Sequence, residues 1–332
     1  MKRSQCAAAV AAIGLAACTP AWTSSGSPEP MPVTVASRTV PHTDPGRRFT
    51  IYRTSTGQQI GFDELVESSA KADVVFFGEQ HDDPETHFAE FALLEALGHR
   101  HASVTVSLEM FERDVQPALS QYLEGQLGEA DFLAQSRPWE RYATDYRPMV
   151  QLARARGWPV VAANVPRPMA SAVSRAGMKT LDTVSAASRA FAAREMVCPH
   201  NAYYDRFAIE MNGHSAGGGP PTASDSAQMR LMTDRFYEAQ CIKDETMAES
   251  ISDRFGAVSP ETGRVQGFAY HVDGAFHSDY RQGTVERLLR RKPYLRVTVI
   301  SAVPVDDPGR VTLGQEGAKA DFVVFTQKPT KK

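Results

Sequence analysis

Residues 74–81 read VVFFGEQH, an apolar run that ends in a glycine and, three positions later, a histidine. Residues 268–277 repeat this arrangement as FAYHVDGAFH. Short apolar runs of β-branched and aromatic residues are typical of buried strands, and a glycine after such a run marks a turn. Each Gly-x-x-His sequence therefore stands at the carboxyl end of a predicted strand.

The rest of the body alternates between strand and helix patterns. Further strands are predicted over 104–108, 159–163, 295–301 and 322–326, with a short hairpin over 49–60. Helices are predicted over 63–71, 84–98, 115–125, 131–156 and 283–291. Strands that alternate with helices favour an α/β fold, and we predict a mostly parallel, doubly wound sheet.

Between residues 168 and 263 the pattern changes to helices without strands. Methionine is enriched there, and a helix predicted over 229–252 has an apolar stripe interrupted by Lys243. Methionine fills irregular spaces, so these side chains either complete a core or line an apolar pocket. We predict a helical lid at about 168–263, inserted into an α/β domain that spans 47–332.

The first residues have the order of a bacterial lipoprotein signal. Lys2 and Arg3 precede a short apolar segment, and Leu-Ala-Ala-Cys at 15–18 stands where cleavage would fall. The apolar segment is too short to span a bilayer. The resemblance predicts a signal peptide over 1–17 and a lipid on Cys18. An ordinary signal peptide that contains a cysteine is the alternative.

The stretch 18–46 is rich in Pro, Ser, Thr and Gly and is predicted to be a flexible tether. We expect a protein anchored in the bacterial cell envelope and facing the periplasm. Thr19 follows the lipidated cysteine, and the absence of an aspartate there favours the outer membrane.

Cysteine usage agrees with export. Cys6 leaves with the signal and Cys18 takes the lipid, so Cys198 and Cys241 remain in the body. The oxidising periplasm permits a disulfide between them. Two free buried thiols or half of a metal site are the alternatives, although no Cys-x-x-Cys spacing supports the latter.

The charge balance argues against nucleic acid as a partner. The chain has 36 Lys and Arg against 39 Asp and Glu, a formal net charge of −3, and no long basic run. Neutralising phosphates requires a concentrated basic surface. The 42% content of hydrophobic residues supplies a full core.

The paired motifs predict a site at one edge of the sheet. Ligands of open α/β sheets bind outside the carboxyl ends of the strands, where residues distant in sequence meet. His81 and His277 would meet there, together with Glu79 and with Glu109 at the end of a third strand.

Several blocks of sequence resemble the ChaN-like haem-binding lipoproteins. They are FFGEQHD at 76–82, SLEMFERD at 107–114, ANVPR at 163–167 and GAFHSDY at 274–280, with Trp139 and Tyr146 between them. The resemblance covers about residues 48–301. This family belongs to a superfamily with the Tiki and TraB proteins and the erythromycin esterases, some of which are metal-dependent proteases or hydrolases. The resemblance to the ChaN-like family implies an α/β fold with a helical insertion, a role in haem or iron acquisition, and haem held between two subunits of a homodimer.

The first functional interpretation is therefore haem binding. Haem iron accepts histidine or tyrosine, and haem propionates pair with basic groups. The candidates are His81, His277, Tyr280, His200, Tyr203 and Tyr204 for the iron, and Lys243 and Arg167 for the propionates. Covalent attachment is excluded because no Cys-x-x-Cys-His is present.

The alternative is a hydrolase or protease. His81, His277 and Glu79 would hold a divalent metal or supply a general base, with Glu79 or Glu109 in the other role. Neither His-Glu-x-x-His nor Gly-x-Ser-x-Gly occurs in the chain. A third interpretation is a vestigial cleft on a protein whose surface binds another envelope protein.

Overall fold

The computed structural model describes residues 48–213 and 223–329, which belong to one unit of the chain. The predicted signal peptide, Cys18 and the tether lie outside the described residues. No helix in the described part is both long enough and apolar enough to cross a bilayer.

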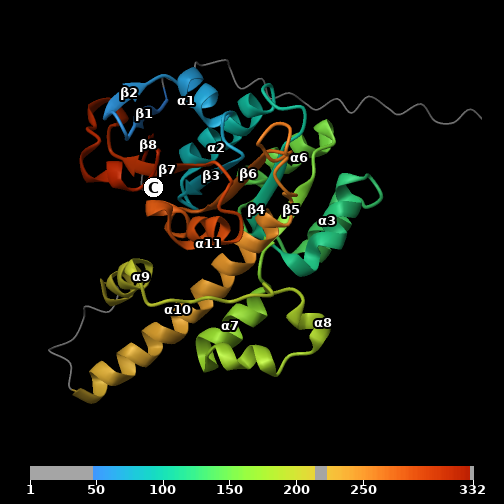
Figure 1. The fold of residues 1–332 in the computed structure, drawn as a ribbon, viewed down its shortest axis with the longest axis vertical. Coiled ribbons are helices and arrows are strands. Elements are labelled where there is room, and N and C mark those ends of the chain that lie inside the picture. Colours follow the sequence, from blue (N-terminus) through green and yellow to red (C-terminus); the bar gives the residue numbers. More distant parts are fainter. Residues whose placement is uncertain (1–47, 214–222, 330–332) are drawn as a thin grey trace, which may run out of the picture. The chain divides into compact units, whose positions relative to one another are not determined.

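Eight strands form one sheet in the order β2-β1-β8-β7-β3-β6-β4-β5 (Figure 1). The strands β3 to β8 are parallel, and β1 pairs antiparallel with both β2 and β8. The prediction of a mostly parallel sheet is confirmed. The strand bounds are β1 Thr50–Arg53, β2 Gln58–Ile60, β3 Val74–Glu79, β4 Thr105–Glu112, β5 Val160–Asn164, β6 Ala269–Gly274, β7 Val297–Val305 and β8 Phe322–Gln327.

Helices cover both faces of the sheet, as the doubly wound prediction requires. Alternate residues of β3 point to opposite faces. Val75 and Phe77 join a core with Leu93 of α2, whereas Val74 and Phe76 join a second core with Ile251 of α10. The helix bounds are α1 Phe62–Ser69, α2 Pro84–Leu97, α3 Gln116–Leu123, α4 Glu129–Ser136, α5 Tyr142–Asp145, α6 Arg147–Arg156, α7 Arg167–Ala176, α8 Ala186–Arg189, α9 Ala202–Gly213, α10 Ala223–Ser252 and α11 Gly283–Arg291.

The long helix predicted over 131–156 is wrong, because three shorter helices occupy this range. Helix α4 ends at Ser136, and the residue that follows it, Arg137, has a left-handed backbone with φ 47°. The following residue is Pro138, and Pro148 stands in the first turn of α6. A left-handed residue cannot continue a right-handed helix, and Pro148 has no backbone N–H to donate within one, so the helical pattern is interrupted.

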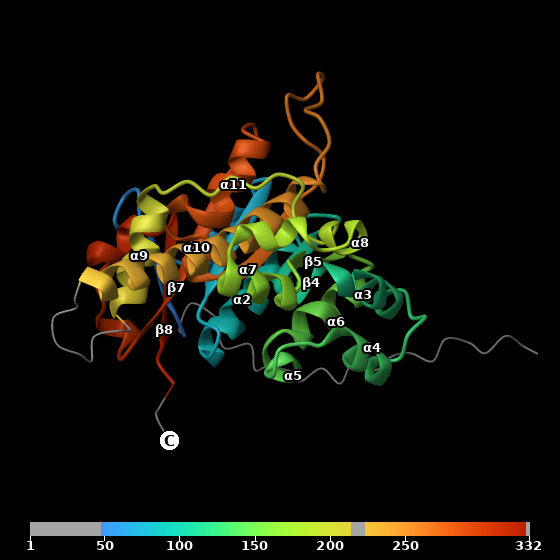
Figure 2. The ribbon, with the colours of Figure 1, turned by 90° about the horizontal axis from the view of Figure 1, so that it is seen from below.

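The helical insertion is confirmed in the described residues between β5 and β6, which form α7 to α10 and no strand. Helix α10 contacts α7, α11 and β5, and its last turns pack on the sheet through Ala248 and Ile251. Its first half extends beyond the sheet, where α9 lies beside it (Figures 1 and 2). The predicted disulfide is also confirmed, because Cys198 is bonded to Cys241, which anchors the segment before α9 to α10.

One side chain makes hydrogen bonds to backbone groups at the outer edge of β5. Nε2 of Gln116 donates to the carbonyl oxygen of Val160 at 3.0 Å, and Oε1 accepts from the backbone N–H of Ala162 at 2.7 Å. Gln116 is the first residue of α3 and so makes the two hydrogen bonds that a neighbouring strand would make.

Candidate functional site

The two Gly-x-x-His motifs lie side by side. Strands β3 and β6 are parallel neighbours in which Glu79 is paired with Gly274, so both chains leave the sheet at the same edge. A Cβ atom at Gly274 would lie 2.8 Å from Nε2 of His81. Glycine is therefore required for this close approach. The backbone N–H of Gly274 also donates to Oε2 of Glu109 at 2.8 Å.

The second motif histidine is buried between two carboxylates. Nδ1 of His277 lies 2.7 Å from Oδ1 of Asp244, and Nε2 lies 3.4 Å from Oε1 of Glu109. Burial alone would lower the pKa of His277, but the charges of Glu109 and Asp244 outweigh burial and raise the pKa to about 10. Burial would raise the pKa of Glu109, but the charge of His277 holds that pKa well below its usual range. The three groups are an ion cluster at neutral pH.

The first motif histidine is more accessible. The side chain of His81 is 48% exposed, and its Nδ1 lies 2.5 Å from Oε1 of Glu79. The ring also packs edge-on against Trp139, with ring centroids 4.9 Å apart. Burial lowers the pKa of His81, but the hydrogen bond with Glu79 and the charge of Glu109 raise it above its usual value. The structure thus brings together Glu79, His81, Glu109 and His277, the four residues predicted at this edge.

A second group of polar side chains lies behind Glu79 and was missed by the sequence predictions. His87 and Glu90 of α2 are buried beside Glu79, and Asp145 of α5 completes the group. Burial and the charge of Glu79 raise the pKa of Glu90 well above its usual value. The spacing His87-x-x-Glu90 places both on one side of a helix, which is a signal the sequence does contain.

The helix that bears these residues begins where its sequence predicts. Asp83 caps it by accepting from the backbone N–H of Glu85, and Pro84 occupies the first turn. Asp83 also accepts from Thr326 of β8 at 2.6 Å. These bonds fix the start of α2 against the sheet and therefore fix the position of His87.

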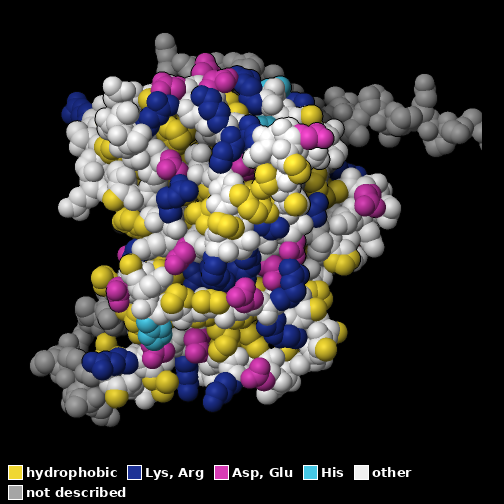
Figure 3. Space-filling view, in the orientation of Figure 1, with side chains coloured by type: hydrophobic (Ala, Val, Ile, Leu, Met, Phe, Trp, Pro, Cys, Tyr) yellow, Lys and Arg dark blue, Asp and Glu magenta, His cyan; other side chains and the backbone are white. Residues whose placement is uncertain are grey.

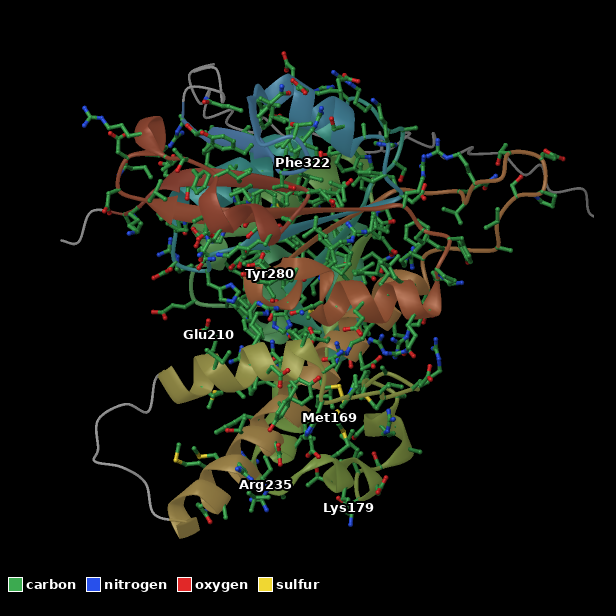
Figure 4. The ribbon with its side chains drawn as sticks, turned by 60° about the vertical axis from the view of Figure 1, so that its left-hand side comes forward. Met169, Lys179, Glu210, Arg235, Tyr280 and Phe322 are labelled. Carbon is green, nitrogen blue, oxygen red and sulfur yellow. A yellow bond between two sulfur atoms is a disulfide. The ribbon has the colours of Figure 1, made fainter. Side chains whose placement is uncertain are left out.

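The tyrosine candidates differ in accessibility. Tyr280 is 40% exposed, lies between the sheet and the insertion (Figure 4), and makes no hydrogen bond through its phenol among the described residues. Its backbone is left-handed, with φ 62°, and the guanidinium of Arg206 lies 5.0 Å from its ring. Tyr203 is buried and accepts from Gln240 at 3.1 Å. Tyr204 donates to Asp234 at 2.7 Å.

The remaining candidates lie further out. His200 stacks on Tyr204, with ring centroids 3.9 Å apart. Arg167 is exposed at the start of α7 and lies 3.8 Å from Glu112 at the end of β4. Lys243 is half-buried and has no ion-pair partner within the described ranges.

One side of α10 faces the ion cluster. Nε2 of Gln240 lies 3.2 Å from Nδ1 of His277. Residues three or four apart share a side of a helix, so Lys243, Phe236 and Met232 extend this side in both directions. Phe236 and Met232 are exposed, and Figure 3 shows hydrophobic side chains among charged ones over α9 and α10.

A cavity of about 760 Å³ lies elsewhere, against the β5 edge. Its lining includes Arg113, Gln116, Trp158, Phe191 and Arg254, and it includes none of the predicted site residues. We therefore place the candidate site at the carboxyl edge and not in this cavity.

Solved structures with a similar fold include ChaN of Campylobacter jejuni, described as showing cofacial heme binding. The alignment has 15% identity, covers 84% of this chain and 97% of that chain, and gives a TM-score of 0.59. The type III effector HopBA1 aligns at 13% identity over 80% of this chain and 93% of its own, with a TM-score of 0.38. A mutant of the erythromycin esterase EreC aligns at 14% identity over 84% of this chain and 82% of its own, with a TM-score of 0.42.

None of the curated proteins matches the chain significantly. Residues 65–288, however, match a protein family described as haem-binding uptake, Tiki superfamily, ChaN. This range includes both Gly-x-x-His motifs, the helical insertion and every candidate residue placed above. The chain therefore belongs to the ChaN family of the Tiki superfamily.

Proposed function

We propose that this protein binds haem at the carboxyl edge of its sheet, between the Gly-x-x-His motifs and the protruding half of α10. The observation that supports this most directly is Tyr280, an exposed tyrosine whose phenol makes no hydrogen bond within the described residues and which adjoins the motif residues of a chain in the haem-binding family. A bound haem would supply an iron that accepts a phenolate as axial ligand.

The residues around Tyr280 fit the other parts of a haem. Arg206 beside the ring offsets the charge of a phenolate, and Lys243 supplies a cation for a propionate. Exposed Phe236 and Met232 offer apolar surface to the porphyrin. The left-handed backbone of Tyr280 is costly for a non-glycine residue, and such strain concentrates at ligand sites.

The other candidates are less suited to bind iron. Both ring nitrogens of His277 have partners, and Tyr203 is buried. His81 keeps an accessible ring, but its Nδ1 is engaged by Glu79 and its Nε2 lies against Gly274. We therefore propose Tyr280 as the axial ligand and His81 as a neighbour that contacts the haem.

The hydrolase alternative fits this geometry less well. A general base and a metal-bound histidine must both be unprotonated. Both ring nitrogens of His277 are already engaged by carboxylates, Nδ1 by Asp244 and Nε2 by Glu109. His277 thus acts as a structural cation between Glu109 and Asp244.

The cellular role is proposed from the N-terminal sequence together with the family. A lipid on Cys18 would hold the protein in the bacterial cell envelope, facing the periplasm, with the outer membrane favoured. Haem binding there would serve haem or iron uptake. If two copies formed a homodimer around the haem, the exposed apolar sides of their two α10 helices would cover it from both faces.

A haemin titration followed by absorption spectroscopy tests the site. The wild-type protein is expected to give a saturable Soret band, and Tyr280→Phe is expected to shift the band and weaken binding by about tenfold or more. Tyr294→Phe is the matched control, since Tyr294 is also 40% exposed but bonds to Gly256. Wild-type protein without a saturable band would refute haem binding, and an unchanged band in Tyr280→Phe would refute the ligand.

A further inference from the structure

Three buried residues next to the proposed haem site direct side-chain nitrogen and oxygen atoms at one another. Nδ1 of His87 lies 3.2 Å from Oε2 of Glu90 and 3.5 Å from Oε2 of Glu79. Atoms from all three residues lie within 4.8 Å of one another. The side chains of Glu79 and Glu90 are 0% exposed, so water does not screen their charges. This group is separate from His277, whose partners are Glu109 and Asp244.

The opposite nitrogen of His87 also faces two oxygen atoms. Nε2 lies 3.1 Å from the carbonyl oxygen of His81 and 3.3 Å from Oδ2 of Asp145. Both are acceptors, so Nε2 can donate to them and leave Nδ1, which faces the two glutamates, able to bind a metal ion through its lone pair. A carboxylate behind a histidine is the usual support of a metal-binding imidazole. Arg141 holds Asp145 at 2.5 Å.

The glutamates have unused oxygen atoms in this group. Within the described residues, Oε2 of Glu79 and Oε1 of Glu90 make no hydrogen bond. Oε1 of Glu79 is occupied, because it accepts from Tyr146 at 2.7 Å and from His81. Buried carboxylate oxygens that face one another and an imidazole nitrogen need a cation or shared protons between them, since burying unpaired charge is costly.

We infer that Glu79, His87 and Glu90 form a buried site for a divalent transition-metal ion of the zinc type. Tetrahedral bonds of ~2.0–2.2 Å place ligand atoms roughly 3.3–3.6 Å apart, close to the separations observed here. One imidazole nitrogen with carboxylate oxygens suits Zn²⁺, which such sites bind more tightly than Mn²⁺ or Fe²⁺. Glu90 would bind through one oxygen or both. The inference does not depend on haem binding.

Protons are the competing occupants. A proton on Nδ1 of His87 and another shared by the glutamates would satisfy the same atoms. The two cases differ in what the purified protein binds, and metal analysis therefore separates them.

The experiment measures zinc in the full-length protein without haem. Metal content is determined as purified, and chelator-treated protein is then titrated with Zn²⁺ alone at neutral pH. One equivalent is expected. Glu90→Gln and His87→Gln should lose this equivalent, whereas the positioning variant Asp145→Asn should weaken binding about 10- to 100-fold. Glu85→Gln is the matched control on α2, because Glu85 pairs with Arg48 at the surface.

Two outcomes would overturn the inference. Wild-type protein that takes up no stoichiometric zinc would show that protons occupy the cluster. Full zinc binding by both Glu90→Gln and His87→Gln would show that the zinc binds elsewhere. Zinc binding by His81→Ala would then test whether the Gly-x-x-His motifs bind it. Circular dichroism shows whether these variants fold. If they do not, zinc binding by Asp145→Asn and the Co²⁺ absorption spectrum of wild-type protein test the site instead. An octahedral Co²⁺ spectrum, or no Co²⁺ signal, contradicts the site.

Discussion

His277 connects two parts of the chain through charge. Glu109 belongs to β4 and Asp244 belongs to α10, so the imidazolium joins the sheet to the insertion. Thr284 adds a hydrogen bond to Asp244 at 3.0 Å. Removing the positive charge would leave two buried carboxylates without a partner, which is strongly destabilising.

We predict a pH-dependent loss of stability from this residue. The pKa of His277 in the folded state is raised from 6.5 to about 10, so its contribution is complete below about pH 6.5 and is lost as the pH rises through 10. The free energy of unfolding of wild-type protein should exceed that of His277→Gln by up to a few kcal/mol near pH 6.5, and the difference should shrink toward pH 10. Denaturant unfolding at several pH values measures it. A difference that stays constant with pH would contradict the assignment.

Strand-end positions were enough to predict the motif residues of the site. Glu79, His81, Glu109 and His277 each follow an apolar run, and parallel strands bring such positions to one edge. Asp244 was not predictable in this way. Its approach to His277 depends on how α10 crosses the sheet, and no local pattern encodes that crossing.

At the scale of elements, α10 has two environments along its length. Its last turns are buried against the sheet, while its first half supports exposed apolar side chains beside α9. The bond between Cys198 and Cys241 ties the segment before α9 to α10. The disulfide therefore stabilises the protruding part more than the sheet.

Removing this bond should loosen the insertion. The cysteines are 43 residues apart in sequence, and closing a loop of that size stabilises a protein by about 2–4 kcal/mol. In a Cys198→Ser, Cys241→Ser double variant we expect faster amide hydrogen exchange in α9, with β3 and β6 unchanged. Exchange measured by mass spectrometry tests this. Equal protection of α9 in both proteins would argue against a stabilising role.

The elements themselves were predicted best where a strong signal ends them. Helix α2 begins at the predicted Pro84, and α11 spans the predicted 283–291. The range 131–156 was misjudged because its apolar spacing continues across Pro138 and Pro148, although both prolines disfavour one continuous helix.

At the scale of the whole molecule, the alternation of strands and helices predicted the type of sheet but not its strand order. Strand β7 lies between β8 and β3. Strand β1 lies between β2 and β8, and β8 is far from it along the chain. Such pairings arise from contacts between distant segments, which the spacing of apolar residues does not report.

We predict that Cys18 determines where the whole molecule resides. The basic residues, the apolar segment and Leu-Ala-Ala-Cys stand in the order of a lipoprotein signal. In the native bacterial host, Cys18→Ser should lack lipid and either stay unprocessed or appear soluble in the periplasm. Metabolic labelling with a fatty-acid analogue and fractionation measure both. Equal labelling of wild-type and variant protein would show that lipidation does not occur at Cys18.

The side chain of Gln116 has a consequence for how copies of the protein can associate. An open sheet edge invites pairing with a strand of another molecule. At the β5 edge the N–H of Ala162 and the carbonyl of Val160 are already bonded to Gln116. A strand of another molecule that approached this edge would find these two backbone groups already occupied, so Gln116 makes sheet extension on this side less favourable.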